Sequence, residues 1–246
     1  NLALATAGAD YPYSWYVLGV TPPITAAAPS HAGGVGAAIS RSFVYTFVTQ
    51  WSEESQPSPP SALTAGKIDG TWTVASMDVA PLNSFTVTAG SWASGAATLT
   101  VASTFGLRVG EHISVSGVTP SGYNVTDAVI TALAATTVGY AVTSDPGAWS
   151  AGGTINRIAP HNTSSMMKRI YWTETVNGEA VYQFVKEVTV ATTSTTVAGN
   201  AESEEPIAST YYQMPPVDMK GLVEMPNGMM AAFHGNELRF CEPFKP

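Results

Sequence analysis

Charge and cysteine are both scarce in this sequence. Charged residues make up 11% of the 246-residue chain, against about 25% in an ordinary soluble domain. The single cysteine, Cys241, cannot form an internal disulfide, so stability has to come from packing and the redox compartment stays open. There are ten Lys and Arg residues and the net charge is −8. Because nucleic-acid affinity depends mainly on Lys and Arg contacts to phosphate, no nucleic-acid binding is expected.

Long apolar runs and helix-forming patterns are also missing. No stretch approaches the roughly 20 apolar residues of a membrane span, so none is predicted. Hydrophobic residues still reach 45%, enough core material for one large or two to three small domains. Thr, Ser, Ala, Val and Gly are plentiful, which is typical of β-rich extracellular or virion proteins. The chain begins with neither an initiator Met nor a signal-peptide pattern, and we expect it to be a fragment of a longer polypeptide.

The strongest strand pattern runs from Arg41 to Trp51. Aromatic residues fall on one face of a period-2 ribbon and valines on the other, so burial of both faces is predicted. Prolines at 57, 59 and 60 then remove backbone donors and fix φ. We predict that they end the strand and carry the chain across a seam between β-sandwich modules. A second block is predicted to form a hairpin, with strands at 166–175 and 180–190.

Two further regions have a different composition. Residues 1–40 contain a strand-like stretch at 11–20 and a small-residue segment with Gly33, Gly34 and Gly36, which predicts an extended segment and linker. Between 83 and 157, short Thr/Val/Ala strands alternate with Gly turns and predict a small β module. Its flanks share an aromatic pattern, so we interpret it as a module nested in a loop of a discontinuous sandwich.

Three segments, in this order, resemble tail structural proteins of tailed bacteriophages: "RSFVYTFVTQWSEESQPSPPSA", "MKRIYWTETVNGEAVYQFVKEV" and "LVEMPNGMMAAFHGNELRFCEPFKP". The first two are similar to a fibronectin-III-like pattern, and the third resembles the opening of a propeller-like or tail-tube-associated β region. The stretch 99–142 resembles a small β module of phage and bacterial surface proteins. The resemblance covers most of 41–246 and implies a structural role in the virion, at the nozzle or distal end of a tail. The family would continue where this chain ends.

The residues offer little chemistry to set against a structural role. His31, His112, His161 and His234 are scattered and show no metal-ligand spacing, which predicts surface or turn positions. Glu53 and Glu54 precede the prolines, and Glu202, Glu204 and Glu205 form an acidic run; both are interpreted as hydrated loops. No Gly-x-Ser-x-Gly elbow is present. We predict no catalytic residue, no metal and no cofactor.

The sequence therefore predicts an all-β chain built on a fibronectin-III-like β-sandwich with a small inserted β module. The predicted domains are an N-terminal segment and linker, 1–40; the sandwich, 41–82 plus 158–200; the inserted module, 83–157; and an extended lead into a further β region, 201–246. The expected function is a non-catalytic component of the phage tail. The alternatives are a receptor- or glycan-binding module displayed by 83–157 and, more remotely, a polysaccharide-degrading fibre fragment.

Self-association is expected because the predicted strand 43–51 lacks the Lys-rich edges that discourage strand pairing. The expected partners are copies of the chain in a closed ring and other virion proteins, with interfaces well over ~1,000 Å². Arg41, Trp51 and Tyr211 are predicted as contact residues at such seams.

Overall fold

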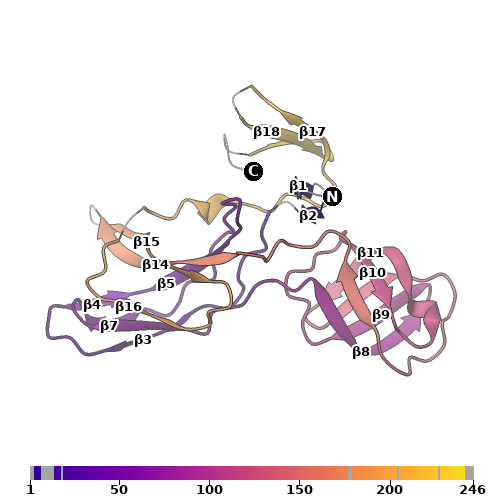
Figure 1. Cartoon of the computed structure of the whole chain (residues 1–246), viewed down its shortest axis with the longest axis horizontal. Coiled ribbons are helices and arrows are strands. Elements are labelled where there is room, and N and C mark those ends of the chain that lie inside the picture. The colour runs from indigo at the N-terminus through magenta and orange to yellow at the C-terminus, as the bar shows by residue number, and fades with distance from the viewer. Residues whose placement is uncertain are drawn as a thin grey trace. The chain divides into compact units, whose positions relative to one another are not determined.

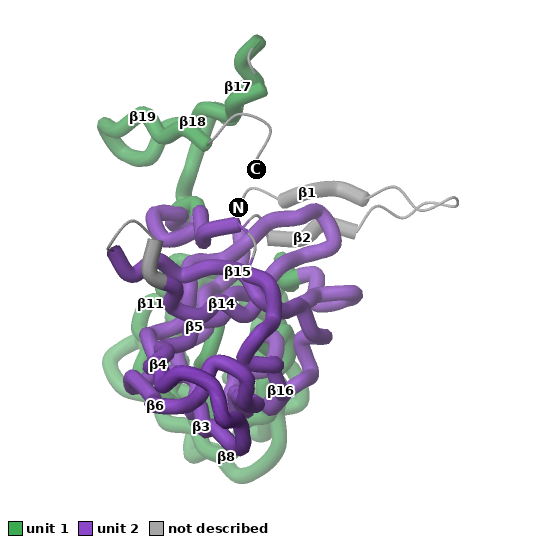
Figure 2. Tube along the Cα trace, turned by 90° about the vertical axis from the view of Figure 1, so that its left-hand side faces the viewer, with its two compact units in different colours: residues 1–18, 81–161, 215–246 green, residues 19–80, 162–214 purple. Residues whose placement is uncertain are grey.

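The regular structure of the described residues is almost entirely β-strand, which confirms the predicted all-β class. The computed structural model describes residues 3–6, 14–17, 19–176, 179–203, 205–226 and 228–241, with only the backbone described at 3–6, 14–17 and 175–176. The helices in this part are single 3₁₀ turns, η1 (Ser121–Tyr123) and η2 (Ser209–Tyr211). The chain divides into two compact units: unit 1 comprises residues 1–18, 81–161 and 215–246, and unit 2 comprises 19–80 and 162–214 (Figure 2).

Unit 2 contains two three-stranded sheets and a two-stranded sheet. The first has the order β15 (Glu179–Thr189), β14 (Met167–Val176), β5 (Phe43–Val48); the second has the order β16 (Thr195–Ala198), β7 (Thr71–Ala75), β3 (Ala28–Ala32). The two-stranded sheet pairs β4 (Ala38–Arg41) with β6 (Thr64–Lys67). Figure 1 shows the β15-β14-β5 sheet lying over β7 and β3. The predicted hairpin at 166–190 is confirmed by the antiparallel pairing of β14 and β15.

Aromatic side chains fill the space between the two larger sheets. Phe43 on β5 lies 5.7 Å from Trp72 on β7 and 6.2 Å from Trp172 on β14, measured between ring centroids. All three rings are fully buried. Every residue of β5 is buried, which confirms the prediction that both its faces are covered. The strand ends at Val48, however, so Trp51 lies in the turn that follows it.

The Ser/Pro segment after β5 does not cross to another module, and that prediction is wrong. The chain turns at Thr49–Ser52 and runs back along the open side of β5. Ser55, Ser58 and Ser61 donate their backbone N–H groups to the carbonyls of Phe47, Tyr45 and Phe43 at 2.8–2.9 Å. Their hydroxyl oxygens accept the N–H groups of the same three residues at 2.9–3.2 Å. The proline-rich segment therefore covers the edge of β5, since serine side chains replace the donors and acceptors that a second strand would supply.

Other strands at the edges of unit 2 are protected in different ways. Ile207 donates its N–H to the Tyr182 carbonyl and Phe184 donates to the Glu205 carbonyl, so segment 205–207 covers part of β15. Lys186 donates to the carbonyl of Thr196 on β16 at 2.7 Å. Pro29 occupies the edge strand β3, where it offers no N–H to a neighbour. The predicted self-association through an open edge of 43–51 therefore loses its basis in this unit.

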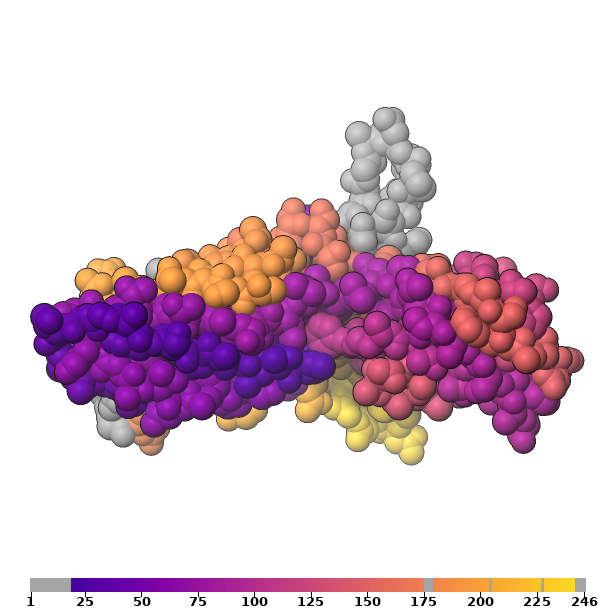
Figure 3. All heavy atoms as spheres, turned by 90° about the horizontal axis from the view of Figure 1, so that it is seen from below, coloured from indigo at the N-terminus to yellow at the C-terminus, as the bar shows by residue number. Residues whose placement is uncertain are grey.

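Residues 19–40 are not a linker, which corrects part of the predicted 1–40 segment. They supply β3 and β4, which pair with β7 and β6, and form a strip along the surface of unit 2 (Figure 3, indigo). The stretch was misread because Ala, Pro, Ser and Gly have low strand propensity. Within residues 1–18, β1 (Ala3–Thr6) pairs with β2 (Ser14–Val17); the rest of that stretch lies outside the described residues.

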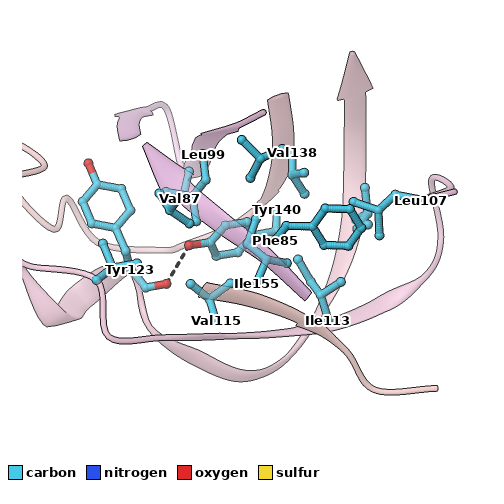
Figure 4. Close-up of a cluster of buried hydrophobic side chains, with 14 residues drawn as sticks. Phe85, Val87, Leu99, Leu107, Ile113, Val115, Tyr123, Val138, Tyr140 and Ile155 are labelled. Carbon is cyan, nitrogen blue, oxygen red and sulfur yellow. Dashed lines mark hydrogen bonds between the residues drawn. The ribbon is translucent and has the colours of Figure 1, made fainter. Parts of the chain in front are cut away.

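Unit 1 contains a closed six-stranded barrel. Its order around the barrel is β10 (His112–Ser116), β11 (Val125–Ala134), β12 (Thr137–Ala141), β9 (Ala96–Val101), β8 (Ser84–Ala93), β13 (Thr154–Arg157). The barrel occupies the range for which the sequence predicts a separate module, 83–157. Its interior is packed with aliphatic and aromatic side chains, and the Tyr140 hydroxyl donates to the Tyr123 carbonyl at 2.6 Å (Figure 4).

The last described part of unit 1 is a three-stranded meander of β17 (Lys220–Glu224), β18 (Met230–His234) and β19 (Glu237–Phe240). It lies in the region predicted as a lead into a further β region, 201–246. Unlike β5, β17 and β19 are exposed along their whole length.

Candidate functional site

Arg41, a predicted assembly contact, lies in the interior of unit 2. Its side chain is 5% exposed and its Nη1 donates to Glu174 Oε1 at 2.5 Å. The guanidinium carbon lies 3.3 Å from the ring centroid of Trp172. Burial lowers the pKa of Arg41, and the hydrogen bond to Glu174 opposes that shift. Arg41 therefore holds β4 against β14, and this burial corrects its prediction as a surface contact.

The other two predicted contact residues differ in exposure. Trp51 is partly buried, in the turn after β5, and its backbone N–H donates to Thr49 Oγ1 at 3.3 Å. Tyr211, at the end of η2, is 90% exposed. Of the three, only Tyr211 presents most of its side chain on the surface, so the structure does not gather them into one site.

The carboxylates before the prolines are structural, which corrects their interpretation as a hydrated loop. Glu53 is buried and accepts the Gly19 N–H at 2.8 Å. Burial raises its pKa, and the bonds from Gly19 and Thr49 oppose the shift. Glu54 accepts hydroxyl bonds from Thr46 at 2.7 Å and Tyr171 at 2.5 Å. Both carboxylates therefore hold the turn against the sheet.

Each of the three histidines other than His161 has its own local partner. His112 contacts Asp127 at 2.6 Å on the outside of the barrel, and His234 contacts Asp218 at 3.1 Å on the meander. His31 Nε2 accepts the Lys67 N–H at 3.0 Å and the ring packs edge-on to Trp72. A Cβ on Gly66 would lie 2.5 Å from that ring, so glycine is needed there.

Buried ionic groups lie at the end of the barrel where the chain enters and leaves. Arg157 donates to Glu111 at 2.7 Å, and both side chains are at most 7% exposed. Arg108 also contacts Glu111, at 3.3 Å. Burial lowers the pKa of Arg157, while the charge of Glu111 opposes the shift. The sequence gives little warning of this pair, because the two residues are 46 positions apart.

His161 and Asn83 join the two connections of the barrel. The Asn83 side chain donates to the His161 carbonyl at 2.9 Å and accepts its N–H at 2.8 Å. Burial lowers the pKa of His161 to about 3, and the positive charges of Arg157 and Arg108 add to that effect. The expectation of a surface or turn position is wrong for His161, which is buried.

Lys168 is a third buried cation, after Arg41 and Arg157, and the sequence does not reveal it. It lies on β14, is fully buried, and donates to the Thr192 carbonyl at 2.5 Å. Burial lowers its pKa to about 8, and the negative charge of Asp78 opposes the shift. The lysine caps a loop carbonyl inside unit 2, so its contacts are structural.

The opposite end of the barrel is built from polar loops and two tryptophans. Trp92 Nε1 donates to the Val142 carbonyl at 2.8 Å, and Trp149 Nε1 donates to the Gly152 carbonyl at 3.3 Å. The Val142 N–H donates to the Gly95 carbonyl, and Thr119 bridges to Ala151. These bonds tie the loops around 94, 119 and 142–153 together at one end.

Unit 1 also has an open hollow of about 540 Å³. Its lining residues are Arg108, Val109, Gly110, Val129, Pro216, Val217, Asp218 and His234. One arginine and one Asp–His pair do not form the two converging carboxylates of a glycosidase site. In the part of the chain that the structure describes, no three His, Cys, Asp or Glu side chains gather as metal ligands.

Comparison with known proteins finds no matching family model, curated protein or solved structure. Among the described residues, no helix is long and apolar enough to cross a membrane.

Proposed function

We propose that this chain is a non-catalytic structural component of a bacteriophage virion, located in the tail at the nozzle or along the tail tube. The resemblance of its three ordered segments to tail proteins supports the family, and the two facing sheets of unit 2 agree with a fibronectin-III-like sandwich. Copies of the chain and other virion proteins are its expected partners.

One observation carries the non-catalytic part of the proposal. The buried side chains suited to acid–base chemistry are each committed to a contact within the fold. Glu53, Glu54 and Lys168 hold loops to unit 2. Glu111 and His161 make contacts at the end of the barrel where the chain enters and leaves. An enzyme of this size would instead direct several such groups into one groove.

The test is to locate the chain in the intact particle by electron cryomicroscopy, using an antibody fragment against the barrel as a marker. Repeated copies in the tail are expected. Absence from purified particles would contradict the proposal. So would hydrolysis of host polysaccharide that a single Glu or Asp substitution abolishes.

The loop end of the barrel favours a second function, binding of a host surface glycan or receptor. Tryptophans and short Ser/Thr/Gly loops gather there, and aromatic rings with polar neighbours suit sugar faces. If it binds, Thr143→Arg on these exposed loops should lower retention on immobilised host polysaccharide. Thr136→Arg, at an exposed position in the β11–β12 turn at the other end of the barrel, is the matched control. Equal retention of both variants and the wild type would exclude this end as the binding surface.

A further inference from the structure

The β18–β19 hairpin of the C-terminal meander carries an apolar row on one face and an ion pair on the other. Phe233 on β18 pairs with Leu238 on β19, and Ala231 pairs with Phe240, which places these four side chains on one face. Phe233, Leu238 and Phe240 are each about half exposed. Residues one position away lie on the other face, where Glu237 and Arg239 contact each other.

The outer edge of β19 carries open hydrogen-bonding groups. The Cys241 N–H donates to the Met230 carbonyl on β18. Backbone groups alternate in direction along a strand, so the N–H and C=O groups of Glu237 and Arg239 also point toward β18. Leu238 and Phe240 therefore direct their N–H and C=O groups away from the sheet, and β19 is the last strand in its order.

Several other edges are protected, whereas no segment among the described residues covers the outer edge of β19. The edge of β5 is covered by serines, β15 by segment 205–207, and the barrel has none. At the other side of the meander, β17 carries Lys220 and a bulge at Gly221, where φ is +64°. Lysine and bulges both discourage strand addition. An unprotected edge beside exposed Leu238 and Phe240 indicates a surface for pairing with another strand.

The sequence of β19 is complementary to itself in one antiparallel register. With a two-fold axis at Leu238, the two Leu238 residues lie opposite each other and exchange their open N–H and C=O groups. Glu237 of each copy then faces Arg239 of the other, on the charged face. On the apolar face, Phe233, Leu238 and their two counterparts form a continuous row. We propose that two copies of this chain pair through β19 in this register.

This pairing rests on the proposed function, because it names a surface for the self-association of a virion component. It differs from the ring contact expected from the sequence. A two-fold contact uses the same patch on both copies and closes at two, so it joins two chains or two rings rather than closing one.

A charge exchange tests the register on the full chain. Analytical ultracentrifugation of the wild type should show a monomer–dimer equilibrium. Glu237→Arg or Arg239→Glu places like charges opposite each other and should weaken pairing at least tenfold. The double variant, or an equimolar mixture of the two single variants, should restore it. Glu202→Arg, an exposed reversal outside the meander, is the control. A monomeric wild type, or single variants that pair as the wild type does, would overturn the proposal.

Crosslinking tests the axis directly. In a Cys241→Ser background, Leu238→Cys should form an intermolecular disulfide on mild oxidation, because paired Cα atoms lie about 5.5 Å apart. Phe240→Cys should not, since the two copies of this residue would be offset by about 14 Å along the strands. Leu238→Pro removes an N–H that faces away from β18, together with the leucine side chain, and should abolish pairing while the chain stays folded. If the chain is found in tails but Leu238→Cys does not crosslink, or if another strand occupies this edge in the particle, the pairing is wrong and the proposed function stands. If it pairs but is absent from particles, the proposed function fails instead.

Discussion

The barrel and the sandwich solve the same problem in different ways. A sheet edge with open N–H and C=O groups invites unwanted pairing. The barrel removes its edges by closing six strands on themselves. Unit 2 keeps its sheets open and covers their edges with serines, an irregular segment, a lysine and a proline. The barrel's protection follows from its topology, so no single side chain decides it, whereas the sandwich depends on particular residues. Single substitutions should therefore change the stability of one unit without changing that of the other.

The largest expected effect is on the barrel alone. Glu111→Gln leaves Arg157 buried without its partner charge, and breaking a buried pair costs about 3–5 kcal/mol. Chemical denaturation followed by tryptophan fluorescence should show an earlier transition for the barrel and an unchanged one for unit 2. The double variant Glu111→Met/Arg157→Met should recover much of the loss. Equal destabilisation of both transitions would show that the units do not unfold separately.

The serine cover should be the weak point of the sandwich. Ser58→Ala removes the acceptor for the buried Tyr45 N–H, and an unsatisfied buried donor costs about 1–3 kcal/mol. Replacing Ser55, Ser58 and Ser61 together should also expose the β5 edge and cause concentration-dependent association. Exposed Ser194→Ala is the control for loss of a hydroxyl, measured by urea denaturation and light scattering. A triple variant as stable and monodisperse as the control would contradict this role.

Acid should destabilise the barrel through His161. Its pKa is about 3 in the folded chain and about 6.5 when unfolded. Between these values the unfolded chain binds the extra proton, so stability is full above pH 6.5 and falls as the pH drops. The slope approaches about 1.4 kcal/mol per pH unit. Denaturation measured from pH 7 to 5 should show this slope of unfolding free energy in the wild type and in the His112→Gln control. The slope should be absent in His161→Asn. A slope that persists in His161→Asn would assign it to other groups.

The smallest expected effect is on unit 2 when the barrel is removed. The Asn83–His161 bonds hold the two connections together, so a short link can bridge them. Replacing 84–156 with a Gly–Ser link should leave the stability of unit 2 within about 1 kcal/mol, because closure cost grows slowly with loop length. Circular dichroism and denaturation check this. An unfolded product would show that the barrel is required for folding.

The parts that the sequence predicted are those with strong local patterns. The aromatic alternation of β5 predicted a strand buried on both faces, and the β14–β15 hairpin followed from its two strand patterns around Asn177-Gly178. The strands at 28–32 and 38–41 were missed because they depend on pairing with β7 and β6 rather than on their own residues.

The site residues were harder to predict because burial is a property of the folded chain. Arg41 looks like a surface cation in sequence, and only the stacking on Trp172 and the bond to Glu174 explain its position. The spacing of Ser55, Ser58 and Ser61 was a usable signal. A serine at every third position beside prolines fits an extended segment that presents the same side to a neighbouring strand. The prolines alone correctly predicted the end of the strand, but they also led to the wrong prediction of a crossing to another module.

Amide hydrogen exchange along β5 and β19 tests the central claim, that this chain covers the edge of β5 by itself and leaves that of β19 open. In dilute monomer, the N–H groups of Phe43, Tyr45 and Phe47 should be strongly protected, because each is bonded to a serine hydroxyl. Those of Leu238 and Phe240 should exchange quickly and become protected as the concentration rises. Fast exchange at Phe43, Tyr45 and Phe47 in the monomer, with protection only on association, would contradict the account.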